Sequence, residues 1–299
     1  MQPTHGCTSI DLLNLVGLTG LMQRTIGSPQ LAIGLIDGPV AMDLPHFAGQ
    51  TVRGGQGNSC SRASSAACMH GTFVAGILSA PRGSAAPAIC PGCTLLVRSI
   101  FAETVEPPDN VPRATPGDLA LAIVDSVKAG ARVLNISTAV TERSIRGEIQ
   151  LEQALDYAAG RGVIAVAAAG NQALVGGSSL TQHPSVISVI GCDREGMPTN
   201  ESNLGRSIGR RGLSAPGRNV TSLGTDGKSL TLSGTSAAAP FVTGAIALLW
   251  SEFPNASATE IRLAVGRARG GRRRAITPPL LNAWAAYQTM REARSRGGP

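Results

Sequence analysis

Aromatic residues are scarce in this chain: phenylalanine, tryptophan and tyrosine together make up 3% of its 299 residues. Glycine is abundant by contrast, with 37 residues. Small side chains let helices lie close against strands, whereas many sandwich folds depend on aromatic-rich cores. The composition therefore favours an α/β fold, and the length suffices for a substantial core in one large domain or two small ones.

Long apolar runs and an N-terminal targeting signal are both absent. Residues 163–169 and 241–250 are among the longest apolar runs, far short of the roughly 18 residues that a membrane-spanning helix needs. The first residues contain no basic stretch leading into an apolar one, as a secretory signal does. We therefore expect a cytoplasmic location and no membrane association.

The six cysteines lie at positions 7, 60, 68, 90, 93 and 192. Without a secretory signal, free thiols are the favoured interpretation and local disulfides are the alternative. Cys90 and Cys93 have the spacing of half a zinc site, but Cys60 and Cys68 are too far apart to complete it. No loop shows the dense alternating acids of a calcium site. We therefore predict no metal and no cofactor, and we interpret Cys68 as a small buried apolar residue.

The formal net charge is +7, and much of the positive excess lies near the C-terminus. The arginines concerned are Arg262, Arg267, Arg269, Arg272, Arg273 and Arg274. Such a cluster could attract nucleic acid, an anionic membrane or an acidic peptide. Because no aromatic residues for base stacking lie among these arginines, we expect a solvated surface and no nucleic-acid partner.

Apolar runs alternate with helical patterns along most of the chain. The expected strands are residues 31–36, 95–100, 132–137, 163–168 and 186–191, and the expected helices between them are 70–78, 118–129 and 148–159. Asp118 is the expected cap of the second of these helices, and Gly130 its end. This alternation indicates βαβ crossovers, and so predicts a mostly parallel sheet with helices on both faces.

The two ends of the chain have patterns of their own. Residues 11–26 predict one short helix closed by Gly27. Further along, residues 219–223 and 229–233 predict short strands, and an apolar helix follows to about residue 250. Ser257 and Glu260 have the spacing of a capping box, and residues 280–293 predict a last helix.

Three residues with reactive side chains lie where a parallel sheet collects its functional groups. Asp37 ends the first strand, His70 begins the following helix, and Ser236 begins the late apolar helix. Acyl transfer needs a nucleophile, a base that takes its proton, and a buried acid that orients the base. Ser236, His70 and Asp37 would supply these functions in turn.

An acyl-transfer site also needs hydrogen-bond donors for the oxyanion that develops on the substrate. Asn171 directly follows the strand at residues 163–168, where its side chain could reach the substrate. The backbone N–H of Ser236 would be a second donor, because it lies in the first turn of a helix and has no partner within it.

Each segment alone is a weak signal, but the four together resemble the subtilisin-like serine proteases. The matching segments are Asp37-Gly-Pro, HGTFVAG from His70, AAGN ending at Asn171, and GTSAAAP around Ser236. Two further segments, residues 133–137 and 213–217, add to the resemblance, as does the order acid, base, serine. The resemblance implies a three-layer α/β peptidase domain over residues 28–299, with helices at 257–293 packed on it and residues 1–27 as an extension.

By the same resemblance, the chain would be a serine endopeptidase that forms a covalent acyl-enzyme with a peptide or protein substrate. The substrate would lie extended between two rims of a cleft. One rim would be Ser137, Thr138 and Ala139, and the other Ala168, Ala169 and Gly170. The family usually has glycine at the position of Ala139, so we expect an altered specificity pocket here.

Other departures leave the reactive side chains in place. Phe73, Ala237 and Phe241 replace residues usual in the family, and Asp37 is followed by Gly-Pro. The Asp-Gly-Pro segment and residues 95–103 are similar to the branch that trims ribosomally made peptides in natural-product maturation, as in cyanobactin pathways. Two alternatives stay open: a subtilisin-like scaffold that binds a peptide or partner without useful catalysis, and nucleic-acid binding through the arginines.

Overall fold

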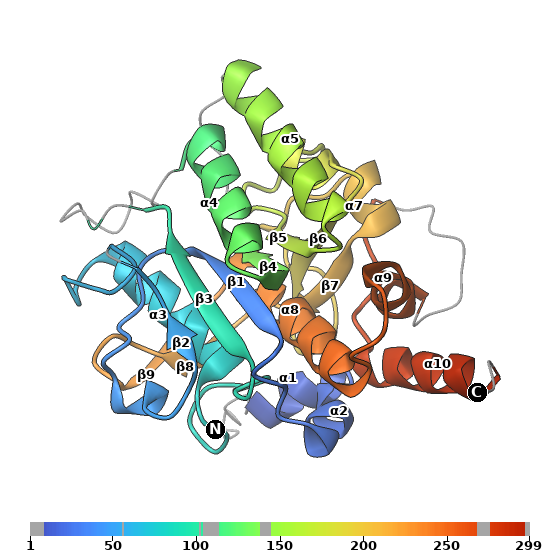
Figure 1. The fold of residues 1–299 in the computed structure, drawn as a ribbon, viewed down its shortest axis with the longest axis horizontal. Helices are drawn as coiled ribbons and strands as arrows, with labels where there is room; N and C mark the ends of the chain where they lie inside the picture. Colours follow the sequence, from blue (N-terminus) through green and yellow to red (C-terminus); the bar gives the residue numbers. More distant parts are fainter. Residues whose placement is uncertain are drawn as a thin grey trace, which may run out of the picture.

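The computed structural model describes residues 9–55, 57–101, 103, 114–137, 145–267 and 276–296. A seven-stranded sheet lies at its centre (Figure 1). Its strands are β1 (Ala32–Asp37), β2 (Val52–Arg53), β3 (Thr94–Ser99), β4 (Ala131–Ile136), β5 (Ile164–Ala168), β6 (Val186–Cys192) and β7 (Leu213–Pro216). Their order is β2-β3-β1-β4-β5-β6-β7, and every neighbouring pair is parallel. The predicted parallel sheet is confirmed.

Helices cover both faces of this sheet, as predicted (Figure 1). They are α1 (Ser9–Leu15), α2 (Leu18–Arg24), α3 (Ala66–Ser79), α4 (Pro116–Lys128), α5 (Ile145–Gly160), α6 (Ser179–Gln182), α7 (Arg206–Arg211), α8 (Thr235–Glu252), α9 (Ala258–Arg267) and α10 (Ala283–Arg296), with a 3-10 turn at Pro45–Phe47. Leu35 and the other inward side chains of one sheet face share a core with α3 and α8. Ile36 and its equivalents on the other face share a core with α4 and α5.

The sheet topology brings the ends of distant strands to one edge. Strand β1 lies between β3 and β4, so its last residue, Asp37, is completely buried. Because the paired strands run in the same direction, β4 and β5 end at the same edge, at Ile136 and Ala168. Polar side chains at these ends are therefore near one another although they are far apart in the sequence.

Helices α3 and α4 begin elsewhere than the sequence patterns predicted. Helix α3 begins at Ala66, because the side chain of Ser65 accepts a hydrogen bond from the Cys68 N–H and caps the helix; His70 therefore lies beyond its first turn. Helix α4 is capped by Thr115, and Asp118, the predicted cap, is the third helical residue and completes a capping box. Both helices begin with small and polar residues, which lack the apolar period by which a helix is predicted.

The N-terminal segment forms two helices where the sequence predicted one. Gly17, between α1 and α2, has a φ of 66°, which turns the chain, and a Cβ there would lie 2.9 Å from Asn282 Oδ1. Leu18 and Leu21 of α2 are fully buried in the core that includes α8 and α10. Helix α10 begins at Ala283, three residues after the predicted start.

The other elements that the sequence predicted match their predictions closely, whereas β2, β7, α6 and α7 had no prediction. Strands β8 (Val220–Leu223) and β9 (Ser229–Leu232) form an antiparallel pair beside the main sheet. The capping box of α9 is present, because Glu260 accepts from the Ser257 N–H at 2.7 Å and Ser257 Oγ accepts from the Glu260 N–H at 3.2 Å. Within the described ranges, no helix combines the length and the apolar character needed to cross a membrane.

The cysteines correct one of our expectations. Cys60 and Cys68 form a disulfide with 5.6 Å between their Cα atoms, so the free-thiol interpretation is wrong for this pair. The fold closes the loop before α3 onto that helix and brings the two residues together. Cys90, Cys93 and Cys192 are free and buried, while Cys7 lies outside the described residues. Over the same residues, no group of three or more metal-binding side chains is present.

Candidate active site

The structure brings Asp37, His70 and Ser236 into one hydrogen-bonded chain. Asp37 Oδ1 lies 2.7 Å from His70 Nδ1, and His70 Nε2 lies 2.9 Å from Ser236 Oγ. Both distances are those of good hydrogen bonds. The imidazole is 27% exposed and the carboxylate is completely buried, so the chain runs from the protein interior toward solvent. This arrangement can carry a proton from the serine hydroxyl to the imidazole.

Two glycines allow Asp37 and His70 to come this close. A Cβ at Gly38 would collide with the carbonyl oxygen of Ala67, and one at Gly71 would collide with the carbonyl oxygens of Gly38 and Pro39. The end of β1 and helix α3 therefore touch backbone to backbone, and His70 precedes Gly71 on the face toward Asp37. The Asp-Gly-Pro segment, which departs from the usual family pattern, supplies one of these two glycines.

Ser236 is held at the start of α8, the longest of the described helices. It is the second residue of α8, whose N-cap is Gly234 with a φ of 139°, a conformation that side chains rarely adopt. The Gly234 N–H donates to the carbonyl of Gly217 at 2.7 Å, which fixes the approach of the chain. The Ser236 hydroxyl is thereby presented at the helix end toward His70, and its backbone N–H lies in the first turn, as predicted.

Asn171 lies beside this helix start. Its Oδ1 accepts a hydrogen bond from the Thr235 N–H at 2.9 Å, which leaves the Nδ2 donors for another partner. A Cβ at Gly234 would lie 2.8 Å from Nδ2, so the amide is next to the residues that present Ser236. The Gly170 N–H donates to Thr235 Oγ1 at 3.0 Å and further ties this segment to α8.

The environment of His70 changes the pKa of its imidazole. Burial lowers that pKa, but the negative charge of Asp37 and the hydrogen bond to it raise it more, so the pKa lies above the ordinary value of about 6.5. Asp37 Oδ1 also accepts from the Gly38 N–H at 2.6 Å, which holds the carboxylate in place. Its Oδ2 is buried without a partner among the described residues.

The predicted cleft rims are only partly described. Ser137 directly follows β4 and is buried. Ala168 is the last residue of β5, and Ala169 and Gly170 come after it at the same edge of the sheet. Thr138 and Ala139 lie outside the described residues.

A buried polar chain, which sequence reasoning missed, supports Ser137. Thr243 Oγ1 donates to Asn135 Oδ1 at 2.8 Å, and Asn135 Nδ2 donates to Ser137 Oγ at 2.7 Å. Asn135 and Thr243 are completely buried. Their signal in the sequence was a polar residue inside an apolar strand and another inside an apolar helix, which invites a search for partners. These two hydrogen bonds link α8, which holds Ser236, to the end of β4.

Comparison with known proteins places these features in a family. A sequence model of the subtilase family matches residues 31–275. Thermophilic serine proteinase of Bacillus sp. (strain AK1) is 32% identical over 248 residues, which cover 81% of this chain and 57% of that protein. Thermitase of Thermoactinomyces vulgaris is 28% identical, with 78% of each chain covered.

Solved structures give the same result. The protease domain of PatA is 29% identical, with a TM-score of 0.78, over 89% of this chain and 97% of that one. The prenylagaramide maturation protease PagA is 27% identical, with a TM-score of 0.77, over 91% and 97%. Among the curated relatives, the chain spans 51% of the thermostable alkaline protease of Halalkalibacterium halodurans and 61% of mycosin-3 of Mycobacterium tuberculosis. The family match covers most of the chain and includes Asp37, His70, Asn171 and Ser236: the chain belongs to the subtilase family.

Proposed function

We propose that this protein is a serine endopeptidase that hydrolyses peptide bonds through a covalent acyl-enzyme. The observation that carries the proposal is the hydrogen-bonded chain from Asp37 through His70 to Ser236, with distances of 2.7 and 2.9 Å, in a member of the subtilase family. Ser236 Oγ attacks the substrate carbonyl while His70 Nε2 takes its proton. Asp37 holds the imidazole in the required tautomer and stabilises the positive charge that develops on it.

The tetrahedral intermediate places a negative charge on the former carbonyl oxygen. We assign its stabilisation to the Nδ2–H of Asn171 and the backbone N–H of Ser236. The hydrogen bond from the Thr235 N–H to Asn171 Oδ1 supports this assignment, because it orients the amide with Nδ2 as the remaining donor. His70 then returns its proton to the leaving amine, and a water molecule hydrolyses the acyl-enzyme by the same route in reverse.

For the substrate, we propose an extended peptide that lies between the ends of β4 and β5. Ser137, Thr138 and Ala139 would form one rim of the cleft, and Ala168 to Gly170 the other. The hydrogen bonds from Thr243 through Asn135 to Ser137 support this arrangement, because they fix the start of the first rim. A backbone held in this way can pair with substrate N–H and C=O groups.

We further propose that the substrate is a ribosomally made precursor peptide. PagA is a prenylagaramide maturation protease, and a further structure of PatA describes it as a patellamide maturation protease. Both are about as similar to this chain in sequence as thermitase is, and this chain covers nearly their whole length. A precursor peptide is long enough to contact the protein outside the cleft.

Labelling with a fluorophosphonate probe tests the proposed mechanism. We expect the wild-type protein to label at neutral pH, and the Ser236→Ala and His70→Ala variants to remain unlabelled. Ser207→Ala, in α7, is the matched control and should label like the wild type. Absence of labelling in a folded wild-type protein would contradict the proposal and favour a scaffold that only binds peptides.

A further inference from the structure

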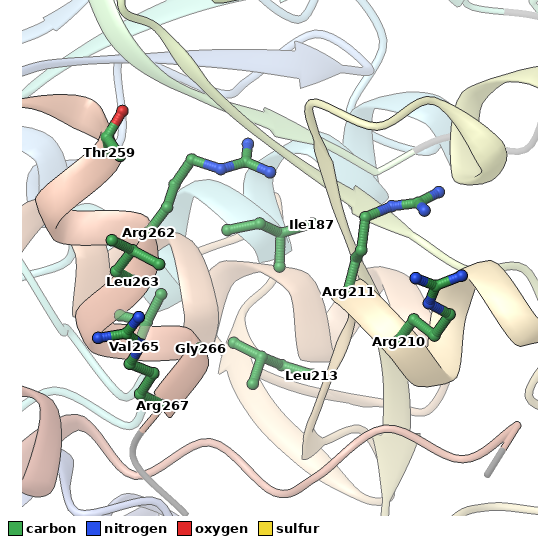
Figure 2. A pocket seen from close by; sticks show the side chains of 10 residues that line it. All are labelled: Ile187, Arg210, Arg211, Leu213, Thr259, Arg262, Leu263, Val265, Gly266 and Arg267. Carbon is green, nitrogen blue, oxygen red and sulfur yellow. The ribbon is translucent and has the colours of Figure 1, made fainter. Parts of the chain in front are cut away.

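A cavity lies between α7 and α9 (Figure 2). Its volume is about 330 Å³. Four arginines line it: Arg210 and Arg211 on α7, and Arg262 and Arg267 on α9. Apolar side chains form most of the remaining wall, namely Ile187, Leu213, Leu263 and Val265. We call it the arginine cavity.

The arginine cavity lies where the strands of the sheet begin, and the candidate active site lies where they end. Ile187 is the second residue of β6 and Leu213 is the first of β7, whereas Asp37 is the last residue of β1. Because the strands are parallel, their beginnings and ends lie on opposite sides. The seven residues of β6 correspond to a length of roughly 20 Å. A ligand group held in the arginine cavity therefore does not itself contact Ser236.

Two of the guanidinium groups are fixed by backbone carbonyls. Arg262 donates to the carbonyls of Ser185 and Pro184, and Arg211 donates to the carbonyl of Gln182 at 2.7 Å. Both arginines are thus anchored on the same short segment before β6. They have no acidic partner among the described residues, and the lining of the cavity contains no acidic side chain.

The electrostatics of this pair are unfavourable without an added negative charge. Burial lowers the pKa of Arg262, and the positive charge of Arg211 lowers it further. Arg211 Nε is buried and has no hydrogen-bond partner among the described residues. An anionic group placed in the cavity would reduce the repulsion and would meet several N–H donors at once.

The apolar wall restricts the kind of anion that fits. Ile187, Leu213 and Val265 present aliphatic surface inside the cavity, and Leu263 is 45% exposed at its side. Figure 2 shows Ile187 and Leu213 between the arginines of α9 and those of α7, while Leu263 and Val265 lie on α9 itself. Aliphatic ligand groups gain from contact with such a wall. Single-stranded nucleic acids gain affinity when their bases stack on aromatic side chains, and no aromatic residue lines the cavity.

We propose that the arginine cavity binds an acidic segment of the peptide substrate, in which carboxylate side chains alternate with aliphatic ones. The proposal rests on the peptidase function proposed above, because that function makes a long peptide the ligand. An extended chain covers at most about 3.6 Å per residue, so the acidic segment lies at least about six residues from the scissile bond. Substrates with such a segment would bind at two separate places on the protein.

Fluorescence anisotropy with a protein variant that cannot cleave peptides tests whether an acidic peptide binds to the arginine cavity. The probe is a fluorescein-labelled dodecapeptide of alternating Glu and Leu, added to the Ser236→Ala protein, which separates binding from turnover. We expect Arg210→Glu combined with Arg267→Glu to weaken binding by on the order of tenfold or more, since both side chains are exposed and their reversal leaves the core intact. Arg53→Glu combined with Lys128→Glu is the matched control: it changes the net charge equally, away from the cavity, and should have little effect.

Three outcomes of this measurement would overturn the proposal. Equal losses in the cavity variant and the control would mean that only net charge matters. Equal binding of a dodecapeptide of Glu and Ser would remove the role of the apolar wall. Tighter binding of a twelve-nucleotide single-stranded DNA, lost in the cavity variant, would assign the cavity to nucleic acid instead.

A turnover experiment separates this proposal from the function on which it rests. A peptide that the wild-type protein cleaves is extended by a spacer of about 15 Gly and Ser residues and the Glu–Leu segment. We expect the extension to lower KM without changing kcat, and the cavity variant to lose this gain. Cleavage with an unchanged KM would overturn the cavity proposal alone. Anisotropy binding without cleavage of any peptide would contradict the peptidase function and leave the acidic-peptide site in place.

Discussion

Each ring nitrogen of His70 has a partner in the proposed active site, which fixes its tautomer. Asp37 accepts from Nδ1–H, so Nε2 is left as the acceptor that faces Ser236. A completely buried carboxylate is costly unless it is bonded, and here the Gly38 N–H and His70 both donate to its Oδ1. At the scale of single residues, the mechanism therefore depends on side chains whose orientation is already set before substrate binds.

The raised pKa of His70 predicts how activity depends on pH. The base acts in its neutral form, so kcat/KM should rise with pH and level off only above an apparent pKa higher than about 6.5. Asp37→Asn removes the charge that raises this pKa, and should shift the acid limb to lower pH as well as reduce kcat by on the order of ten-thousandfold. Measured kcat/KM profiles of both proteins check this. An acid limb at the same pH in both would contradict the assigned cause.

Asn171 has two proposed roles, as the acceptor for the Thr235 N–H and as a donor to the oxyanion, and two replacements separate them. Asn171→Asp keeps Oδ1 as the acceptor for the Thr235 N–H but removes the Nδ2 donors, whereas Asn171→Ala removes both. We expect each variant to lower kcat by on the order of a hundredfold or more with a small change in KM. Steady-state kinetics on a cleaved peptide give the result, and unfolding curves check that the fold is intact. Wild-type turnover in either variant would exclude the oxyanion role.

The next scale is the contact between secondary-structure elements, where β1 and α3 meet through glycine. Gly71→Ala would place a methyl group against the carbonyl oxygens of Gly38 and Pro39, so α3 must move away from the end of β1. We expect a loss of kcat/KM of about a hundredfold, because misplacement of His70 by about 1 Å is enough for that. Gly160→Ala, at the end of α5, is the control, since a Cβ there meets nothing within 4 Å. Equal activity of the two variants would exclude the contact as a positioning device.

The disulfide between Cys60 and Cys68 joins the loop before α3 to that helix. It closes a short loop with a sequence separation of 8, for which chain entropy predicts a stabilisation of about 2–3 kcal/mol. We expect Cys60→Ser combined with Cys68→Ser to lower the free energy of unfolding by about this amount, as measured by chemical denaturation. The wild-type protein should lose the same amount in reductant, while the double variant should not respond. A reductant-insensitive wild type would contradict the disulfide's contribution.

For the molecule as a whole, α2 and α10, which come from the two ends of the described chain, pack together against α8. Arg24 at the end of α2 forms an ion pair with Glu252 at 3.0 Å and lies 4.8 Å from the ring centre of Tyr287 in α10. Trp284 and Tyr287 stack with centroids 5.1 Å apart. The helix that presents Ser236 is thus supported at its far end by α2 and α10, so we expect packing there to affect the stability of the whole molecule.

A cavity in this terminal cluster should therefore destabilise the fold as a unit. Leu21 is fully buried in α2, and Leu21→Ala should lower the free energy of unfolding by about 2–5 kcal/mol. Leu121→Ala, in α4, is the control, because that side chain is 67% exposed and its loss should cost within about 0.5 kcal/mol. Urea unfolding measures both. A stability for Leu21→Ala equal to that of the control would show that the N-terminal helices fold independently of the rest.

The sequence by itself determined the class of fold and the candidate site. Alternating apolar strands and helices are local patterns with a fixed period, so they predicted the parallel sheet without knowledge of contacts. Asp37 and Ser236 were found because a parallel sheet places reactive groups at strand ends and helix starts, and His70 and Asn171 because their segments match a family pattern. These inferences need only neighbours in the sequence or a motif, and the hydrogen-bonded geometry agrees with them.

Only the tertiary structure decided which distant residues touch. The contact of Gly38 with α3, the pairing of Cys60 with Cys68 and the support of Ser137 by Thr243 all join segments whose separation in the sequence carries no period. The arginine cavity is the clearest case, because Arg211 and Arg262 line the same cavity only after α7 and α9 have packed on the sheet. Contacts of this kind depend on how the helices pack against the sheet, and no local pattern in the sequence indicates them.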